Sequence, residues 1–177
     1  PFCYLTLSHF LGALGYSSML LLPLYLDHLG GSRAEIGAVK SSAHLAGLLT
    51  RPLVGWCLDH LGRRRSLVLG GLLTALSLAS VGLITTVGPL AYGVRALFGA
   101  AEGFLFTGYF AFASDLIPSE RRTEGLALFG VAGLLPLLVN PISDVLGFEG
   151  ASLRPFIMGV SGLVALSALL VLMIPRE

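Results

Sequence analysis

"RPLVGWCLDHLGRRRS", residues 51–66, places a carboxylate and three consecutive arginines between two long apolar runs. The first glycine of this stretch has no side chain, which lets a neighbouring helix approach closely. Gly62, directly before the arginines, permits the sharp turn that reverses a chain between two helices. The guanidinium fork of Arg63 can reach a carboxylate on a neighbouring helix, and Asp115 is the candidate. The stretch therefore predicts a tight turn at which charges from different helices meet.

The rest of the chain is strongly apolar. Of its 177 residues 55% are hydrophobic and 12% are charged, whereas soluble domains are about 25% charged. Six apolar segments are each near or above the ~20 residues that a helix needs to cross ~30 Å of hydrocarbon. They are residues 2–26, 36–58, 67–87, 89–113, 125–146 and 153–174. The sequence thus predicts an all-α membrane protein with six transmembrane helices in a lipid bilayer.

The short connections between these segments carry unequal charge. Six arginines fall on one side of the membrane and two on the other: Arg63, Arg64, Arg65, Arg121, Arg122 and Arg176 against Arg33 and Arg154. Because short cytoplasmic loops are enriched in Lys and Arg, we expect both termini in the cytoplasm of a plasma membrane, the inner membrane in a bacterium. The net charge of +1, with no basic patch interleaved with aromatics, does not indicate a nucleic-acid partner.

A faint internal repeat accompanies this topology. Residues 54–65, "VGWCLDHLGRRR", align with residues 139–150, "VNPISDVLGFEG", with Val, Asp, Leu and Gly at the same offsets. One segment ends the second apolar run and the other ends the fifth, on opposite sides of the membrane. Inverted three-helix repeats are a building plan of secondary transporters, so the match predicts two such repeats within this chain.

Three motifs resemble those of the major facilitator superfamily. Gly55-x-x-x-Asp59-x-x-Gly62-Arg63-Arg64-Arg65 is similar to the family signature between its second and third helices. Residues 114–122, "SDLIPSERR", resemble the family's Asp-x-x-Pro-x-x-Arg-Arg pattern, and Arg95-x-x-x-Gly99-x-x-x-Gly103 resembles a fourth-helix pattern. The resemblance covers residues 1–177 as one domain, the amino-terminal six-helix half of a twelve-helix protein. It implies a carboxyl-terminal half, or a second copy, as partner.

In this family the loop between the second and third helices acts as a conformational latch on the cytoplasmic side. The resemblance assigns that role to Gly55, Asp59, Gly62, Arg63, Arg64 and Asp115, with Arg121 and Arg122 as members of the same charge network. For Arg64 and Arg65 the alternative stays open that they only orient the chain in the membrane.

Ionisable residues also occur inside the apolar segments. Lys40, His44 and Arg51 fall within about 40° of one another on a helix and form a polar stripe. Arg95 and Glu102 are seven residues apart, hence on one face, and about 10 Å apart along the axis, too far for a direct pair. Placing such a group in lipid costs at least ~2.5 kcal/mol at a helix centre. We therefore expect the pair on the fourth segment to face a central cavity.

These residues are the predicted cavity and coupling group. Arg95 matches a family arginine linked to proton or anion handling, although Phe98 replaces the glutamine that usually follows it. Glu102 is the best candidate for a protonatable coupling group, because a carboxyl in low dielectric can bind a proton near neutral pH. The alternative is that Glu102 forms a structural salt bridge. His44 and Arg51 are grouped with them, and for His44 a hydrogen-bonded packing role stays open.

Further polar residues lie near the middle of the predicted membrane helices. Tyr16, Tyr109 and Asn140 are candidates for lining a substrate site, with helix packing as the alternative for each. Pro136 and Pro141 should kink the fifth helix.

The leading interpretation is a secondary active transporter of a small-molecule substrate that works by alternating access. Proton coupling is expected, and efflux is favoured over import. The alternatives are a non-transporting partner or receptor that has kept the fold, and an intramembrane enzyme. No Gly-x-Ser-x-Gly, His-Glu-x-x-His or paired-aspartate pattern occurs, and Cys3 and Cys57 lie far apart. The sequence accordingly predicts no catalytic residue, no metal and no cofactor.

Overall fold

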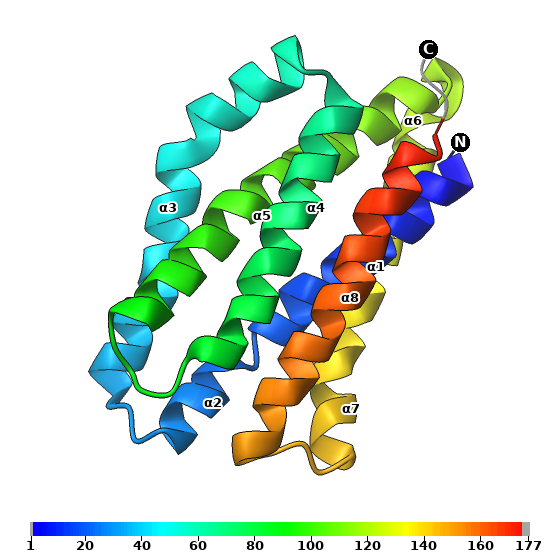
Figure 1. Cartoon of the computed structure of the whole chain (residues 1–177). Coiled ribbons are helices and arrows are strands. Elements are labelled where there is room, and N and C mark those ends of the chain that lie inside the picture. The colour runs from blue at the N-terminus through cyan, green and yellow to red at the C-terminus, as the bar shows by residue number, and fades with distance from the viewer. Residues whose placement is uncertain (1, 175–177) are drawn as a thin grey trace.

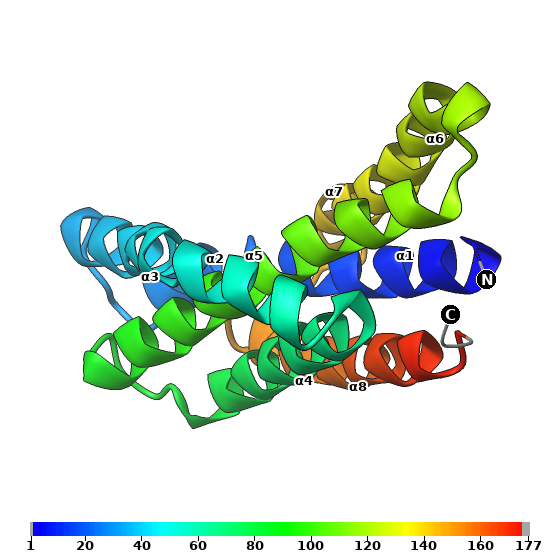
Figure 2. The same ribbon diagram turned by 90° about the horizontal axis from the view of Figure 1, so that it is seen from above.

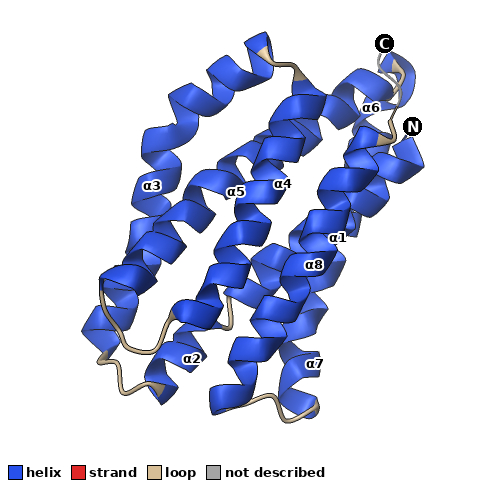
Figure 3. Cartoon of the chain, viewed as in Figure 1, coloured by secondary structure: helices blue, strands red, loops and turns tan. Residues whose placement is uncertain are grey.

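The structure, a computed structural model, describes residues 2–174, which form helices joined by short loops, with no strand in this range (Figure 3). The long helices are α1 (Phe2–Met19), α3 (Arg33–His60), α4 (Arg63–Ser80), α5 (Pro89–Leu116), α6 (Arg122–Leu134) and α8 (Leu153–Leu172). Two short helices are α2 (Leu22–His28) and α7 (Val139–Val145), and four 3-10 turns are Val81–Leu83, Ser119–Arg121, Leu135–Leu138 and Gly150–Ser152.

Five helical segments in the described residues are long and apolar enough to cross a membrane. They are Phe2–His28, Arg63–Leu83, Pro89–Leu116, Ser119–Val145 and Gly150–Leu172. Helix α3, expected to span over residues 36–58, is not among them. It has 28 residues, as many as α5, but Lys40, His44 and Arg51 interrupt its apolar sequence. The all-helical class is confirmed, and the count of six spans stays a prediction.

Helix α3 has clear signals at both ends. At its start the Ser32 hydroxyl accepts from the Glu35 amide, while the Glu35 carboxylate accepts from the Ser32 amide, a capping box. Beyond its end Gly62 adopts φ +84°, a conformation that favours glycine. Because this turn is so short, α4 begins at Arg63 instead of residue 67. The three arginines expected in a connection are therefore the first turn of α4.

Two of the expected spans are not continuous helices. The first, residues 2–26, breaks between α1 and α2 just before Pro23. The fifth, residues 125–146, begins earlier than expected, at the 3-10 turn Ser119–Arg121, and consists of α6, the 3-10 turn containing Pro136, and α7. Since proline cannot donate to the helical ladder, the 3-10 turn at Pro136 fits the distortion expected there, whereas Pro141 lies inside α7 and does not interrupt it.

The helices pack in an order that differs from the chain order. Helix α5 packs between α3 and α4, α4 packs on α8, α8 packs on α1, and α1 packs on α6. Figures 1 and 2 show α3 and α6 at opposite edges of the resulting bundle, with α4 and α8 together on one side. The start of α1 and the end of α8 lie at the same end of the bundle as the turn between α3 and α4 (Figure 1). We call this the arginine end.

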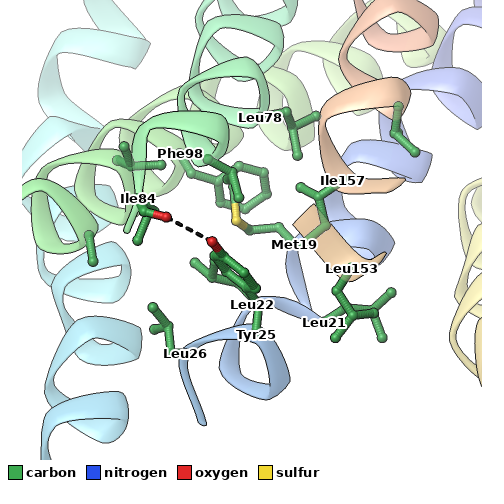
Figure 4. Close-up of a cluster of buried hydrophobic side chains, with 14 of the residues drawn as sticks. Met19, Leu21, Leu22, Tyr25, Leu26, Leu78, Ile84, Phe98, Leu153 and Ile157 are labelled. Carbon is green, nitrogen blue, oxygen red and sulfur yellow. Dashed lines mark hydrogen bonds between the residues drawn. The ribbon is translucent and has the colours of Figure 1, made fainter. Parts of the chain in front are cut away.

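A core of buried apolar side chains fills the opposite end of the bundle. Met19, Leu22, Phe98 and Ile157 come from four different helices and meet there (Figure 4). The Tyr25 hydroxyl donates to the Ile84 carbonyl at 2.8 Å, which satisfies a polar group inside this core. The core thus ties α2 and the α4–α5 connection to α1, α5 and α8.

The contact between α3 and α5 depends on small residues. A Cβ built on Gly99 would overlap the backbone carbonyl of Ala43, and one built on Gly47 would lie 3.1 Å from the Gly99 carbonyl oxygen. The absence of a side chain at Gly99 therefore lets the two backbones approach closely.

Candidate functional site

A cavity of about 480 Å³ lies between α1, α5 and α6. This volume falls within the ~300–1,000 Å³ that is typical of small-molecule sites. Most of the wall is apolar or aromatic, and the aromatic members are Tyr16, Phe98, Phe106, Tyr109 and Phe110. The other polar side chains in the wall are His9, Thr74 and Glu102. The cavity is therefore an apolar space with few polar groups, one of them a carboxyl.

Helix α5 presents both Arg95 and Glu102. Glu102 lines the cavity, whereas Arg95 is 5% exposed and is not part of the wall. The guanidinium carbon of Arg95 lies 5.1 Å from the centroid of the Phe98 ring, a cation–π contact. No ion pair joins the two charged residues in the described part of the chain. This agrees with the separation expected from their seven-residue spacing.

Glu102 is half-buried at the wall of the cavity. It lines a cavity whose wall is mostly apolar and also holds the polar side chains of His9 and Thr74 and two tyrosines. Its neutral form is compatible with an apolar environment, and its charged form attracts cations. Arg95 lies seven residues, about two helical turns, before it on the same helix.

His9 is a cavity residue that the sequence pattern did not single out. Its imidazole is 8% exposed and stacks on the Phe129 ring at a centroid distance of 4.3 Å. Phe110 meets it edge-on at 5.8 Å, and a Cβ on Gly133 would overlap the ring. The available signal was a titratable residue inside the apolar run 2–26, but sequence alone does not show which face of α1 meets α6.

Tyr109 lines the cavity and also joins three helices. Its hydroxyl oxygen lies 2.7 Å from Ser8 Oγ and donates to the Ser8 carbonyl at 2.9 Å. Ser8 Oγ in turn donates to the Ser167 carbonyl of α8 at 2.8 Å. The alternative expected for Tyr109, a packing role between helices, is therefore realised at the cavity wall. Tyr16, also in the wall, is 40% exposed.

Arg95, which was expected to face the cavity together with Glu102, is buried outside its wall, and three further predicted residues also lie outside this cavity. His44 and Arg51 are exposed, because α3 turns its buried face towards α5. Asn140 lines a second hollow of about 490 Å³ near the opposite end of the bundle, together with Asp27 and Asp144. The structure thus does not bring these three residues together with Glu102 within the described half.

At the arginine end, Arg63 joins three helices. Its Nε donates to Asp115 Oδ2 of α5 at 3.2 Å. Its Nη1 lies 3.9 Å from Asp59 Oδ1 of α3 and donates to the Leu58 carbonyl at 3.1 Å. The ion pair that the sequence predicts between Arg63 and Asp115 is present in the structure.

The electrostatics of this turn are unusual for a helix start. A helix N-terminus carries partial positive charge and favours anions, yet α4 begins with arginines. The carboxylates of Asp59 and Asp115 offset this repulsion, although their side chains are 75% and 52% exposed. Exposed ion pairs typically contribute about 0.2–1 kcal/mol. The cluster therefore adds little to stability and can be broken at low cost.

The remaining residues of the predicted latch are more loosely placed. Arg64 Nη2 donates to the Leu172 carbonyl and links α4 to α8. A Cβ on Gly55 would meet no atom within 4 Å, so the close helix contact expected there does not occur within residues 2–174. Arg121 and Arg122 are exposed at the same end of the bundle, and neither forms an ion pair with another described residue.

Comparison with known proteins assigns the family. The sequence matches the profile of the Major Facilitator Superfamily over residues 5–177. The chain belongs to this superfamily. The solved structure of a proton:xylose symporter of the superfamily, bound to 6-bromo-6-deoxy-D-glucose, superposes with a TM-score of 0.79. At 18% identity the match covers 99% of this chain and 45% of the symporter. This neighbour shows that the two share a fold.

Two bacterial relatives are closer in sequence. Multidrug resistance protein 2 of Bacillus subtilis (strain 168) is 27% identical over 114 residues, 64% of this chain and 28% of that protein. The Staphylopine export protein of Staphylococcus aureus (strain Mu50) is 25% identical over 126 residues, 71% of this chain and 31% of that protein. The chain spans less than half the length of these proteins. The family and its named neighbours are multi-pass membrane transporters and not enzymes.

Proposed function

We propose that the chain is one half of a secondary active transporter that moves a small solute by alternating access. The cavity between α1, α5 and α6 carries this proposal, because it is large enough for a small molecule and presents the carboxyl of Glu102 to its interior. Binding energy for the solute comes from the aromatic wall, and the carboxyl gives the site a charge that can be switched by a proton. An aromatic or amphipathic solute fits this lining.

Transport is coupled to protons through Glu102 in this proposal, with Arg95 modulating the exchange. A proton and a cationic solute compete for the same carboxylate, so release of one favours binding of the other. The names of the bacterial relatives, a multidrug resistance protein and an export protein, favour efflux. The structural neighbour is a proton symporter, which supports proton coupling.

The arginine end serves as the cytoplasmic gate. Arg63, Asp59 and Asp115 bind helices α3, α4 and α5 to one another when no other partner is present. Since these ion pairs are exposed, the same side chains can exchange partners with the other half of the transporter at low cost. Arg64, Arg121 and Arg122 contribute further positive charge at this end. In the membrane this end lies in the cytoplasm, as the distribution of arginines between short loops predicts.

Six spans in two inverted repeats complete the proposal. In the packing order α3, α5, α4, α8, α1, α6, the helices are the second, fourth, third, sixth, first and fifth spans. If the first, second and third spans are exchanged with the fourth, fifth and sixth, the same order results, read in the opposite direction. Gly62 and Gly147, at matched positions of the sequence repeat, have φ of +84° and +71°. A two-fold axis between α4 and α8 accounts for both observations.

Reconstituted full-length protein tests this function directly. In proteoliposomes with an imposed pH gradient, we expect movement of the fluorescent aromatic cation ethidium against its concentration gradient, and loss of that movement when a protonophore is added. Val131→Trp, which fills the cavity wall, should abolish transport, whereas Leu166→Trp on α8 should not, since Leu166 is exposed and outside the cavity. Equal transport by both variants would contradict a route through this cavity.

A further inference from the structure

Helix α3 has three faces of different character. Its buried face packs against α5 and holds Val39, Ala43, Val54 and Cys57. A second, exposed face holds Lys40, His44, Leu48 and Arg51, and a third, also exposed, holds Leu45, Leu49, Leu53 and Trp56. At 100° per residue the second and third faces are separate stripes along the helix. The polar stripe is therefore distinct from an apolar stripe that lipid can cover.

The polar stripe lies deep in the membrane if α3 is a span. With a rise of about 1.5 Å per residue, α3 is about 42 Å long, and His44 and Arg51 lie about 16 and 27 Å from its first residue. Both positions fall inside the central ~30 Å of hydrocarbon. An arginine facing lipid there costs about 2.5–3.5 kcal/mol or more. This cost excludes lipid as the natural neighbour of the stripe.

The described half offers these side chains no counter-ion. Within residues 2–174, neither Lys40 nor Arg51 forms an ion pair. Glu35 is held by Ser32 in the capping box at the start of α3, and Asp59 lies beside Arg63 at the other end. The carboxylates on α3 itself are thus engaged at its two ends, away from His44 and Arg51.

Two glycines lie on the same face as the stripe. A Cβ on Gly37 or on Gly55 would meet no atom within 4 Å. Their lack of a side chain therefore serves no packing purpose inside the described half. Small residues on a membrane helix allow the backbone of another helix to approach, so the glycines indicate a helix as the neighbour of this face.

We propose that this face of α3 packs against a membrane-spanning helix that presents carboxylates at the depth of His44 and Arg51. We call it the cationic face; it comprises Gly37, Lys40, His44, Leu48, Arg51 and Gly55. The partner helix belongs to the other half of the transporter, so the inference rests on the proposed function in this respect. The chain covers 45% of the symporter chain, which leaves further helices to supply the partner. The buried charge pairs fix the register between the two halves.

Spin labels on adjacent residues distinguish the two exposed faces. Leu48, on the cationic face, is 58% exposed in this half, and Leu49, on the apolar face, is 70% exposed. Leu48→Cys and Leu49→Cys are labelled separately in full-length protein that lacks Cys3 and Cys57, then reconstituted in liposomes. We expect the Leu49 label to collide with oxygen, which partitions into lipid, several-fold more often than the Leu48 label. The Leu48 label should also be shielded from a water-soluble nickel chelate.

Each of the other outcomes overturns the inference. High oxygen accessibility at both positions would mean that the cationic face meets lipid. High accessibility of the Leu48 label to the nickel chelate would mean that the face lines a water-filled pathway. Neither readout depends on transport, so the docking inference and the proposed function can fail separately.

Substitutions of Arg51 test the chemistry of the partner helix. Arg51→Gln removes the charge, whereas Arg51→Glu places a carboxylate opposite the expected carboxylate. Like charges in a low-dielectric contact repel strongly, so we expect Arg51→Glu to reduce the amount of folded full-length protein several-fold more than Arg51→Gln does. Size-exclusion chromatography in mild detergent measures this amount. Equal loss in the two variants would show that no anionic group faces Arg51.

Discussion

Two groups of ionisable side chains in this chain differ in exposure and in pairing. Arg63, Asp59 and Asp115 form ion pairs at the arginine end, where all three side chains are at least 38% exposed. Arg95 and Glu102 lie within α5 and form no ion pair with each other, although Arg95 is buried. The first group forms ion pairs in an exposed position, where an ion pair adds little stability. The second group forms none in a more buried position, where a charge without a partner destabilises the fold.

This difference indicates that neither group exists to stabilise the fold. An exposed ion pair is weak because water screens it, so the ion pairs at the arginine end can be broken at low cost. A half-buried carboxyl without an ion-pair partner in a mostly apolar wall gains little when charged, so it is poorly suited to stabilise the fold. The first group is suited to a contact that changes partners, and the second to a group that changes protonation.

The largest effect is expected from Glu102→Gln. The amide cannot release a proton, so the variant should lose gradient-driven accumulation of ethidium completely, down to the level of empty liposomes. Exchange of labelled for unlabelled ethidium across the membrane should continue, because alternating access itself needs no proton release. The two assays on the same preparation check this prediction. Accumulation of ethidium by the variant with wild-type pH dependence would mean that Glu102 has a structural role. The contrast between the charge cluster at the arginine end and a proton-binding group on α5 would then fail.

Arg63→Ala should reduce transport several-fold while leaving the amount of inserted protein nearly unchanged. The variant removes the bridge between α3, α4 and α5, whereas membrane orientation is maintained by the remaining arginines. Arg65→Ala is the matched control, since Arg65 is exposed and forms no ion pair with another described residue. Initial rates normalised to protein level provide the measurement. Equal rates for the two variants would mean that the charge cluster has no part in gating.

Substitution of the two turn glycines separates the backbone from the arginines. Gly62→Ala and Gly147→Ala each force a side chain into the left-handed region, which costs about 1–2 kcal/mol. We expect similar decreases in the thermal unfolding temperature of the two variants in detergent. Transport should fall more for Gly62→Ala, because this turn positions Arg63. A larger loss of transport from Gly147→Ala would contradict the assignment of the gate to the arginine end.

Glu35 provides an exposed carboxylate with a purely local role, and the smallest effect. Hydrogen bonds from the Ser32 side chain, and then from its backbone, lower the pKa of Glu35 below its ordinary value of 4.5. Because the folded-state pKa is lowered, the stabilisation is fully present above the ordinary pKa of 4.5. It is lost as the pH falls through the lower pKa of the folded state. Glu35→Gln should thus slightly lower the unfolding temperature at neutral pH, and the difference should vanish in acid. Transport at neutral pH should remain at the wild-type level.

Much of the charge cluster at the arginine end could be predicted from sequence because its parts follow local rules. Gly62 and Arg63 adjoin a helix end, and Asp115 lies in the motif at residues 114–122 near the end of the next helix. The contact between Arg63 and Asp115 could therefore be predicted from the family resemblance and the order of the helices alone. The common face of Arg95 and Glu102 followed from seven-residue spacing. Periodicity did not show that only Glu102 lines the cavity, whereas Arg95 packs against Phe98 outside the wall.

The positions of other residues depend on which helix faces meet, and one sequence does not contain this information. Periodicity placed His44 and Arg51 on a single stripe, but only the packing of Val39 and Val54 on α5 shows that the stripe points out of this half. His9 was missed for the same reason, because its place in the cavity depends on the contact of α1 with α6. The break between α1 and α2 differs from these cases, because it lies just before Pro23, a local signal in the sequence.

Labelling of the cavity from each side of the membrane tests the link between gate and cavity most directly. Val131 lines the cavity and is 53% exposed, so Val131→Cys in full-length protein without Cys3 and Cys57 reports access by a membrane-impermeant maleimide. With the wild-type gate we expect labelling from either side, since the cavity alternates. Adding Arg63→Ala should raise the labelling rate from the cytoplasmic side and lower it from the outside. Unchanged rates on both sides would contradict the claim that the arginine end closes this cavity.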